Sequence, residues 1–522
     1  MSTIDVTLQE IVEKAIDDFQ EKYTNNFREG EAGSKTAAAI MMDPNTGEIL
    51  AMASNRKYDL NQPYDLVANG IATQEESDAM TEEERLDKLN ELWRNFCVSD
   101  TYEPGSTAKP ITVAAALESG VVHDGDTFLC DGRQNVGGHE IWCAKKIGHG
   151  VIDLEGSLKF SCNDALMQIA AKLGEEEYSK YQNLFNLGLR TGIDLPGEAR
   201  TDSLIYYAKD LAPSDNLVMG ATDLATNSFG QNFNVTMVQL ISAFSATING
   251  GYYYQPHVVK KIMDSNGGTV KNVEPILLRR PISSKTSALI RQYLYATMYG
   301  AQDANGNNAT GRAARIAGYA MGGKTGTAEK IPRDKTNYLV SFIGFAPADS
   351  PQVVLYVVVD EPNAEDQANS TYPQYIAQGI LSELLPYLNV VPDESEDGTV
   401  PETELWEGFK GHLKSTSISD SELDSDGNLV DADGNLIDWD GNRIDENGYL
   451  LDANGDHILD EEGNYKMSTN LVSASGSTDA DSSGDAVSNP DAPAPLEDDE
   501  AETTEDNDEE TDGITNEEAG LE

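Results

Sequence analysis

Two residues that together could carry out acyl transfer lie three positions apart, Ser106 and Lys109, in the segment EPGSTAKPITVAAALESG. On a helix opened by Pro104-Gly105, this spacing puts both side chains on one face. A serine hydroxyl is a weak nucleophile until a base accepts its proton, and a desolvated lysine with a lowered pKa can act as that base. The positive potential at a helix N-terminus also favours a charged serine oxygen. The pair therefore predicts a nucleophilic serine activated by lysine.

The S-x-x-K pattern is common, and a second copy occurs at Ser54-Asn55-Arg56-Lys57. This copy follows a predicted strand, has no apolar helix after it and places an arginine beside the lysine. We interpret it as a solvated loop without a catalytic role.

An S-x-N pattern, which can offer a hydroxyl and an amide from the start of a helix, occurs three times. Ser161-Cys162-Asn163 lies 55 residues after Ser106, within a segment predicted to be helical. Ser214-Asp215-Asn216 follows Pro213 among ordinary turn-forming residues. Ser468-Thr469-Asn470 lies in the acidic C-terminal region. Taken singly, each copy is a weak signal.

The segment Lys324-Thr325-Gly326-Thr327 is more specific, because a K-T-G triplet is expected by chance only roughly 0.1 times in a chain of this length. It follows Met321-Gly322-Gly323 in a strand-like segment. A glycine inside a strand allows another backbone or a substrate to approach closely. The alternative for the triplet alone is a basic β-turn.

The elements that must position these residues follow from the hydrophobic pattern of the first 390 residues. Residues 6–22 place their apolar side chains on one helical face, and 37–42 and 48–53 form a hairpin around Asp43-Pro44-Asn45-Thr46-Gly47. Further helices are predicted over 106–117, 153–173, 235–249 and 370–388, and further strands over 317–323, 339–345 and 353–360. Because helices lie between an early hairpin and late strands, we expect an α+β fold whose antiparallel sheet is completed by both ends of the domain.

Charge separates the chain into two parts. The 522 residues carry 90 acidic and 36 basic groups, a formal charge of −54, and residues 391–522 alone contribute 40 acidic and 4 basic groups. Such a polyanion is a poor ligand for nucleic acid or anionic lipid, so neither is predicted as a partner. We find no apolar run near the ~20 residues that cross a bilayer and no signal peptide at Met1, and we expect this chain to be soluble as it stands.

Composition also predicts the domain boundaries. Residues 1–390 are long enough for a large core, and 391–423 are interpreted as a linker. Residues 424–466 carry a seven-residue repeat, DSDGNLV DADGNLI DWDGNRI DENGYLL, followed by looser copies. The interpretation of this repeat is a solvated series of turns, with calcium binding as the alternative, although its spacing does not fit known calcium loops. Residues 467–522 are predicted to be a disordered acidic tail.

Four cysteines occur, Cys97, Cys130, Cys143 and Cys162, and none forms a C-x-x-C pair. There is no H-E-x-x-H either, so the sequence predicts neither zinc nor any other metal site. An even number of cysteines permits disulfides without requiring them.

The order S-x-x-K, S-x-N, K-T-G is that of penicillin-binding proteins and class A β-lactamases. The chain resembles the transpeptidase domain of monofunctional (class B) penicillin-binding proteins, nearest to division and sporulation types, from about Leu8 to Leu388. Matching segments are MMDPNTGEILAMAS at 41–54, YEPGSTAKP at 102–110, HG at 149–150, FGQNFNVT at 229–236, NGG at 249–251, GGKTGTAEK at 322–330 and SFIGFAPAD at 341–349. The resemblance implies a penicillin-binding-protein/serine β-lactamase-like fold, with a helix-flanked antiparallel sheet and an all-helical lobe.

The resemblance also implies a role for each motif residue. Ser106 would attack the carbonyl between two terminal D-alanines of a peptidoglycan stem peptide, and Lys109 would accept its proton. Ser161 would pass a proton to the departing D-alanine, Asn163 would hold the substrate backbone, and Lys324 would supply positive potential near Ser161.

In the same family, Thr325 and Thr327 would bind the terminal carboxylate of the substrate, and Gly326 belongs to this substrate-binding segment. The backbone N–H groups of Ser106 and Thr327 would form the oxyanion hole. An amine from a neighbouring stem peptide would then resolve the acyl-enzyme, whereas β-lactams would leave a slowly hydrolysed ester on the serine. No metal or organic cofactor is implied.

Family members usually carry a transmembrane anchor and a pedestal domain, which this sequence does not display. The resemblance therefore implies a place at the extracytoplasmic face of the cell membrane and partners among other wall-synthesis proteins. It also suggests, by similarity to spore-cortex-type members, a redox-sensitive pair of Cys162 with Cys143, or else with Cys130. The alternative is a small, packed thiol at Cys162.

Three other functions compete with D,D-transpeptidation. A β-lactamase would share the motifs but needs a further base for deacylation, which we cannot identify in the sequence. A β-lactam sensor or D,D-carboxypeptidase would share the acylation step. A non-catalytic scaffold for wall synthesis would not require intact motif residues.

Overall fold

The computed structural model describes residues 1–333, 336–388 and 390, together with isolated residues between 443 and 458. The predicted linker (391–423) and acidic tail (467–522) lie outside the described residues. The predicted repeats (424–466) do so too, apart from those isolated positions.

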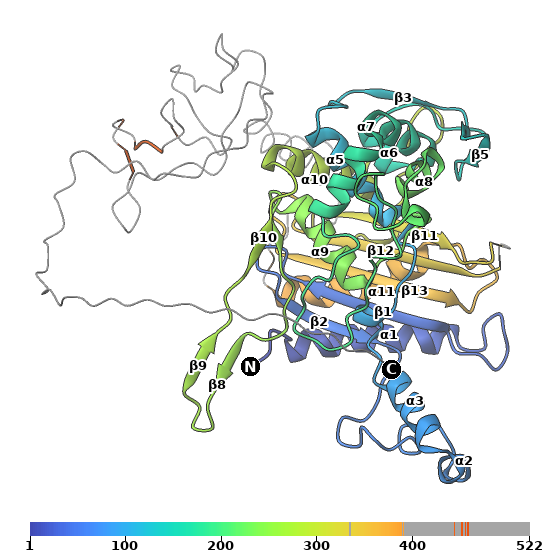
Figure 1. The fold of residues 1–522 in the computed structure, drawn as a ribbon, viewed down its shortest axis with the longest axis vertical. Helices are drawn as coiled ribbons and strands as arrows, with labels where there is room; N and C mark the ends of the chain where they lie inside the picture. Colours follow the sequence, from blue (N-terminus) through green and yellow to red (C-terminus); the bar gives the residue numbers. More distant parts are fainter. Residues whose placement is uncertain are drawn as a thin grey trace, which may run out of the picture.

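A five-stranded antiparallel sheet in the order β11-β12-β13-β1-β2 forms the centre of the fold (Figure 1). Its strands are β1 (Ser34–Met42), β2 (Ile49–Ser54), β11 (Gly322–Glu329), β12 (Tyr338–Ala346) and β13 (Val353–Pro362). The N-terminal hairpin joins the C-terminal strands where β1 pairs with β13, with Ile40 opposite Tyr356. The predicted α+β fold and the completion of the sheet by both ends of the domain are therefore confirmed.

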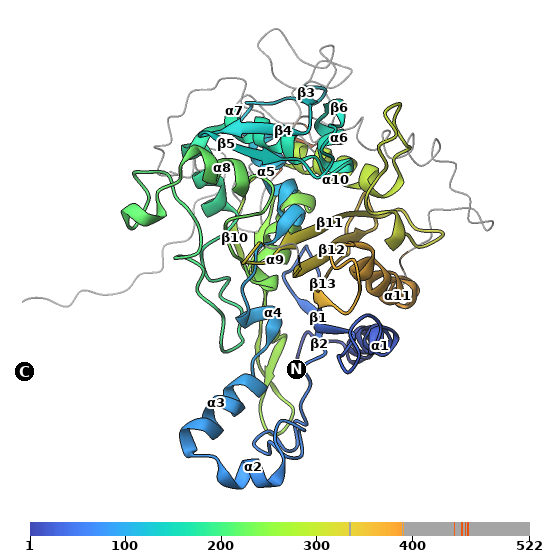
Figure 2. The same ribbon diagram turned by 90° about the vertical axis from the view of Figure 1, so that its right-hand side faces the viewer.

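The apolar run of β1 is buried on both faces of the sheet, because alternate residues of a strand point in opposite directions. Ala38, Ile40 and Met42 belong to one hydrophobic core. Ala37, Ala39 and Met41 belong to a second core. The second core contains the buried faces of α1 (Val6–Tyr23) and α11 (Thr371–Tyr387), which lie side by side against the sheet (Figure 2).

The first core extends from the opposite face of the sheet into a helical lobe, which lies at the top of Figure 1. The helix α9 (Met237–Ile248) is buried at every residue and links the sheet to this lobe. The other helices of the lobe are α5 (Lys109–Glu118), α6 (Leu154–Lys159), α7 (Asn163–Leu184), α8 (Ala221–Asn227) and α10 (Ser284–Tyr299).

The lobe is not all-helical, and this part of the predicted fold is wrong. Two short antiparallel pairs lie on it, β3 (Thr127–Cys130) with β6 (Gly150–Asp153), and β4 (Arg133–Val136) with β5 (His139–Trp142). Each strand has only four residues, and the β4–β5 hairpin is largely exposed. Strands this short and polar produce little hydrophobic periodicity, although Gly137-Gly138 between β4 and β5 is a turn signal.

Smaller elements surround these two layers. The helices α2 (Gln74–Ala79) and α3 (Glu82–Leu92) each begin with a threonine capping box and extend away from the sheet (Figure 2). The hairpin of β8 (Lys261–Met263) and β9 (Thr269–Asn272) also projects from the body (Figure 1). The remaining elements are α4 (Phe96–Ser99), β7 (Tyr253–Tyr254), β10 (Leu277–Arg279) and the 3-10 turns η1 (Gly105–Ala108), η2 (Asp215–Leu217) and η3 (Arg312–Ala314).

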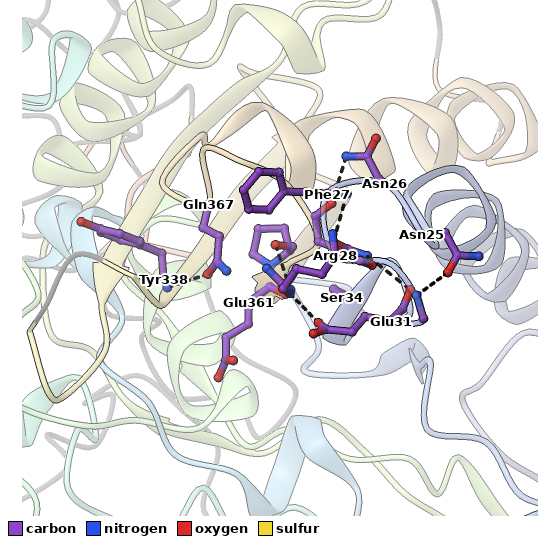
Figure 3. A network of polar contacts seen from close by, with 12 residues as sticks. Asn25, Asn26, Phe27, Arg28, Glu31, Ser34, Tyr338, Glu361 and Gln367 are labelled. Atoms are coloured by element: carbon purple, nitrogen blue, oxygen red, sulfur yellow. Dashed lines mark hydrogen bonds and ion pairs between the residues drawn. The ribbon is translucent and has the colours of Figure 1, made fainter.

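The loop after α1 is fastened to the end of β13 by the buried side chain of Asn363. Its Oδ1 accepts hydrogen bonds from the backbone N–H groups of Phe27 (3.2 Å) and Arg28 (2.6 Å), and its Nδ2 donates to the carbonyls of Arg28 and Glu31. Arg28 also pairs with Glu31 within this network (Figure 3). The network holds the N-terminal helix against the C-terminal strands.

Among the described residues, no helix combines the length and the apolar character that a membrane crossing requires.

Candidate active site

The three predicted motifs come from three separate elements that meet between the edge of the sheet and the helical lobe. Ser106 lies in η1, Ser161 and Asn163 lie where α7 begins, and Lys324 to Thr327 lie on β11 at the sheet edge. Figure 2 shows β11 facing the lobe that carries α5, α6 and α10. Direct hydrogen bonds join the S-x-N motif to the lysines of the other two motifs.

The turn η1, which carries Ser106, is a 3-10 turn that continues into α5, and the backbone N–H of Lys109 donates to the Ser106 carbonyl. The predicted helix over 106–117 is thus confirmed, with a tighter first turn. A hydrogen bond of 2.8 Å from the Gly105 N–H to the Gly230 carbonyl holds the turn from behind. A Cβ at residue 230 would lie 1.8 Å from the Gly105 oxygen, so only glycine fits there.

Lys109 is completely buried and faces the S-x-N motif. Its Nζ donates to the Ser161 carbonyl (2.7 Å), to Ser161 Oγ (3.0 Å) and to Asn163 Oδ1 (2.7 Å). In the part of the chain that the structure describes, no hydrogen bond joins Lys109 Nζ to Ser106 Oγ. The lysine is thus presented to Ser161 and Asn163, with Ser106 one turn away in η1, which continues into α5.

The S-x-N motif interrupts what the sequence predicts as one helix over 153–173. The structure has α6 and α7 instead, and Ser161 between them adopts a left-handed backbone with φ of 54°. Cys162 then caps α7, because its Sγ accepts from the backbone N–H of Ala165 at 3.3 Å. A strained, non-glycine residue at this point fits a functional site, since strain persists only where the surroundings impose it.

Lys324 lies fully buried on β11 and reaches the same serine. Its Nζ donates to Ser161 Oγ (2.9 Å) and to the Thr325 carbonyl (3.0 Å). The strand covers 322–329, so the K-T-G triplet is inside it, whereas the predicted strand over 317–323 was placed too early. The two lysines therefore converge on one hydroxyl, Ser161 Oγ.

Gly326 allows η1 to pack against β11. A Cβ there would lie 2.3 Å from Ser341 Oγ, 3.0 Å from Thr107 Cγ2 and 3.2 Å from the Pro104 oxygen. The absence of a side chain lets η1, the turn that carries Ser106, reach the strand. The neighbouring Thr327 is partly exposed, and its Oγ1 makes a long contact of 3.4 Å with the Ala368 carbonyl.

Burial lowers the pKa of both lysines. Desolvation brings the pKa of Lys109 to about 8, although nearby cysteine thiols oppose the shift. Desolvation, and then the charge of Lys109, hold the pKa of Lys324 well below its usual value. Two adjacent buried ammonium groups repel each other, so one of them loses its proton readily. A neutral amine beside Ser161 is what a general base requires.

The other copies of the short motifs lie away from this centre. Lys57 pairs with Asp17 at 2.7 Å on the surface, which agrees with the predicted solvated loop. Ser214 and Asn216 are exposed beside and within η2. Ser468 lies outside the described residues.

The structure brings Cys143 and Cys162 together, with 3.9 Å between their Sγ atoms, and all four cysteines are free thiols. It also places Cys130 and His149 against this pair, and His149 was not predicted to lie with the cysteines. The available signal was the crowding of Cys and His into residues 130–162, which no C-x-x-C spacing marked.

Comparison with known proteins agrees with this geometry. The family model described as penicillin binding protein transpeptidase domain matches residues 37–382. Stage V sporulation protein D of Bacillus subtilis is 35% identical over 399 residues, covering 76% of this chain and 54% of that protein. Penicillin-binding protein PbpB of Mycobacterium tuberculosis is 28% identical over 342 residues, covering 63% of this chain and 45% of that protein. The chain therefore spans about half the length of these curated relatives.

A crystal structure of penicillin binding protein 3 from Mycobacterium tuberculosis, complexed with aztreonam, has a similar fold. The TM-score is 0.61 at 27% identity, with 75% of this chain and 80% of that chain covered. A complex of the same protein with ampicillin matches equally well, with a TM-score of 0.61 at 26% identity, and 76% of this chain and 79% of that chain are covered.

Proposed function

The chain belongs to the family of penicillin-binding-protein transpeptidase domains, and on this premise we propose that it is a serine-type peptidoglycan D,D-transpeptidase. It cross-links stem peptides through an acyl-serine intermediate and is acylated by β-lactams. The observation that carries the proposal is the convergence of Lys109 and Lys324 on Ser161 Oγ, at 3.0 and 2.9 Å, one helical turn from Ser106.

Acylation begins when Ser106 Oγ attacks the carbonyl between the two terminal D-alanines. The hydroxyl proton passes to Lys109, whose lowered pKa of about 8 keeps a useful fraction of the amine neutral near neutral pH. The charged form of Lys109 has three acceptors within 3.0 Å, two on Ser161 and one on Asn163. These acceptors stabilise the ammonium that forms as the bond to the carbonyl is made.

Ser161 then returns the proton to the leaving group. Its hydroxyl oxygen accepts hydrogen bonds from both lysines. Once Lys109 carries the proton taken from Ser106, Ser161 donates its own proton to the departing D-alanine nitrogen and receives the proton of Lys109 in its place. Lys324 stays within hydrogen-bond distance throughout and biases this serine toward donation. The left-handed backbone of Ser161 fixes the direction of its side chain.

The substrate lies along β11 in this proposal. The hydroxyls of Thr325 and Thr327 bind the terminal carboxylate, and the Asn163 amide holds the peptide backbone. Gly326, between the two threonines, lets the turn that carries Ser106 pack against the strand. The backbone N–H groups of Ser106 and Thr327 stabilise the tetrahedral oxyanion, where one such donor is typically worth about 2.7–4 kcal/mol.

An amine of a second stem peptide then attacks the ester carbonyl, releases Ser106 and forms the cross-link. Because peptidoglycan lies outside the cytoplasm, we place this activity at the extracytoplasmic face of the cell membrane, alongside other wall-synthesis proteins. Residues 1–390 are the catalytic unit in this proposal. The 35% identity to stage V sporulation protein D favours a sporulation or division role.

The experiment is a turnover assay with a synthetic stem peptide ending in D-Ala-D-Ala, with and without an amino-acceptor peptide. Wild type should release D-alanine and form a dimeric peptide when the acceptor is present. Ser106→Ala should do neither, and Ser54→Ala serves as the matched control at the surface S-x-x-K. Release of D-alanine at the same rate with and without the acceptor, and with no dimeric peptide, would indicate a carboxypeptidase. The absence of turnover in folded protein would indicate a scaffold.

A further inference from the structure

A compact group of four potential metal ligands lies beside the S-x-N motif. It consists of Cys130, Cys143, His149 and Cys162, here called the thiol–imidazole cluster, and its ligand atoms all lie within 4.8 Å of one another. All four residues are buried, none with more than 5% of its surface exposed. The remaining cysteine of the chain, Cys97, lies outside this cluster and is also buried, with the Ala39 carbonyl 3.9 Å from its Sγ.

Three of the six separations within the cluster match those around a tetrahedral zinc ion, and all six are within 4.8 Å. With Zn–S bonds of about 2.3 Å and a Zn–N bond of about 2.05 Å, tetrahedral angles place sulfur atoms about 3.8 Å apart and sulfur and nitrogen about 3.6 Å apart. The Sγ atoms of Cys143 and Cys162 are 3.9 Å apart. Nδ1 of His149 lies 3.4 Å from Cys130 Sγ and 3.6 Å from Cys143 Sγ.

The backbone holds the four ligands in place from four different points. Cys130 ends β3, His149 directly precedes β6, and these two strands pair with Cys130 opposite Gly150. Cys143 directly follows β5, and its N–H donates to the Gly132 carbonyl at 2.9 Å. Cys162 is the N-cap of α7. Four rigid positions that converge on one point form a site that needs little rearrangement to accept an ion.

One of the sulfurs also receives a backbone hydrogen bond, because Cys162 Sγ accepts from the N–H of Ala165 at 3.3 Å. Outer partners of this kind orient metal ligands. The carbonyl of His149 is held in turn by the side-chain amides of Asn305 and Asn307, at 3.2 and 3.1 Å.

We propose that the thiol–imidazole cluster binds one zinc ion in a closed tetrahedral site. Four protein ligands leave no open position for a water or a substrate, so the ion is structural. It joins the β3–β6 pair and the β4–β5 hairpin to the N-terminus of α7. Because Cys162 lies between Ser161 and Asn163, the ion fixes the backbone that presents both of these side chains to Lys109.

Zinc accounts for the whole cluster, whereas the disulfide suggested by family resemblance accounts for half of it. A Cys143–Cys162 bond would leave Cys130 and His149 buried against each other without a common partner. The sequence argued against zinc because no C-x-x-C occurs, but the fold assembles the ligands from separate strands and a helix cap. Three cysteines and one histidine are a common ligand set for structural zinc.

The test is the metal and thiol content of the full chain, purified under reducing conditions with zinc present and no chelator. We expect one zinc per chain by elemental mass spectrometry. In denaturant the site comes apart with the fold, so a thiol reagent should find all four thiols while one zinc per chain is released, whereas a disulfide would leave only two reactive thiols. Cobalt should replace the zinc and give the thiolate charge-transfer and tetrahedral ligand-field bands of a site with three thiolates and one imidazole.

The matched variants are Cys143→Ser, His149→Gln, His149→Cys and Cys97→Ser. Loss of a ligand should abolish stoichiometric zinc, whereas Cys97→Ser should retain it. If Cys143→Ser fails to fold, His149→Cys still tests the site, because a set of four thiolates should bind zinc and shift the cobalt spectrum. Two outcomes with wild type would overturn the proposal: four free thiols with no bound metal, or a disulfide with no bound metal. Stoichiometric zinc in folded Cys143→Ser and His149→Gln would also overturn it.

These measurements of metal and thiol content do not depend on transpeptidase activity, so the zinc proposal and the proposed function can be refuted independently of each other. Where zinc is present, we expect its removal to lower both the melting temperature and the acylation rate of wild type.

Discussion

The pH dependence of acylation follows from the burial of Lys109. Desolvation places its pKa at about 8, and only the neutral amine can accept the Ser106 proton. At about pH 7 roughly a tenth of the amine is neutral, and at about pH 9 roughly nine tenths is neutral. The second-order rate constant for acylation by a β-lactam should therefore rise about tenfold from neutral pH to its alkaline plateau, with a midpoint near the lysine pKa.

Lys324 provides a second measurement of the same effect. Burial and the charge of Lys109 hold the pKa of Lys324 well below its usual value, whereas the charge of Lys324 does not contribute to the lowered pKa of Lys109. Lys324→Met should therefore acylate slowly, with the midpoint of its pH profile unchanged near about 8. A midpoint that moved with this substitution would show that Lys324, and not Lys109 alone, sets the pH dependence of acylation.

The assay is stopped-flow or quenched acylation with a chromogenic β-lactam between about pH 6 and about pH 9, with circular dichroism at each pH to show that the fold persists. A flat profile would refute the assignment of Lys109 as the base. A rate that still rises without a plateau at about pH 9 would show that Lys109 is not desolvated in the working enzyme.

Two further predictions concern the packing that positions the site. Gly326→Ala would place a Cβ 2.3 Å from Ser341 Oγ, so we expect a loss of about 1–3 kcal/mol in the free energy of unfolding and slower acylation. The control Gly379→Ala, on α11 with Ala15 Cβ at 3.8 Å, should leave both unchanged or slightly improved, and equal losses in the two variants would contradict this packing. Asn363→Ala removes a buried amide with four backbone partners, so denaturant unfolding should report a loss of at least about 1–3 kcal/mol. Acylation by the folded fraction should be unchanged, and a variant as stable as wild type would show that water replaces the amide.

Much of the fold could be predicted from the sequence because its core elements have clear periodicity. The apolar face of residues 6–22 and the hairpin around Gly47 correspond to α1, β1 and β2. The run over 353–360 corresponds to β13, which is buried on both faces. Elements with short or polar sequences, such as β4 and β5, were missed because their stability comes from tertiary contacts.

The candidate site was predicted through its motifs, but its local geometry was not. The helical pattern over 153–173 gave no sign of the left-handed residue Ser161, because backbone strain of this kind is imposed by surrounding structure. The strand carrying Lys324 was placed too early, since its glycines weaken the β signal. The thiol–imidazole cluster was missed because its ligands meet only in three dimensions.

The most direct test of the central claim is the intact mass of the purified chain after brief incubation with penicillin, followed by peptide mapping. The account predicts one long-lived adduct per chain, located on Ser106 and absent from Ser106→Ala, while Ser54→Ala is labelled like wild type. Unlabelled protein that steadily consumes the drug would identify a β-lactamase instead. An adduct that persists in Ser106→Ala would show that another residue is the nucleophile.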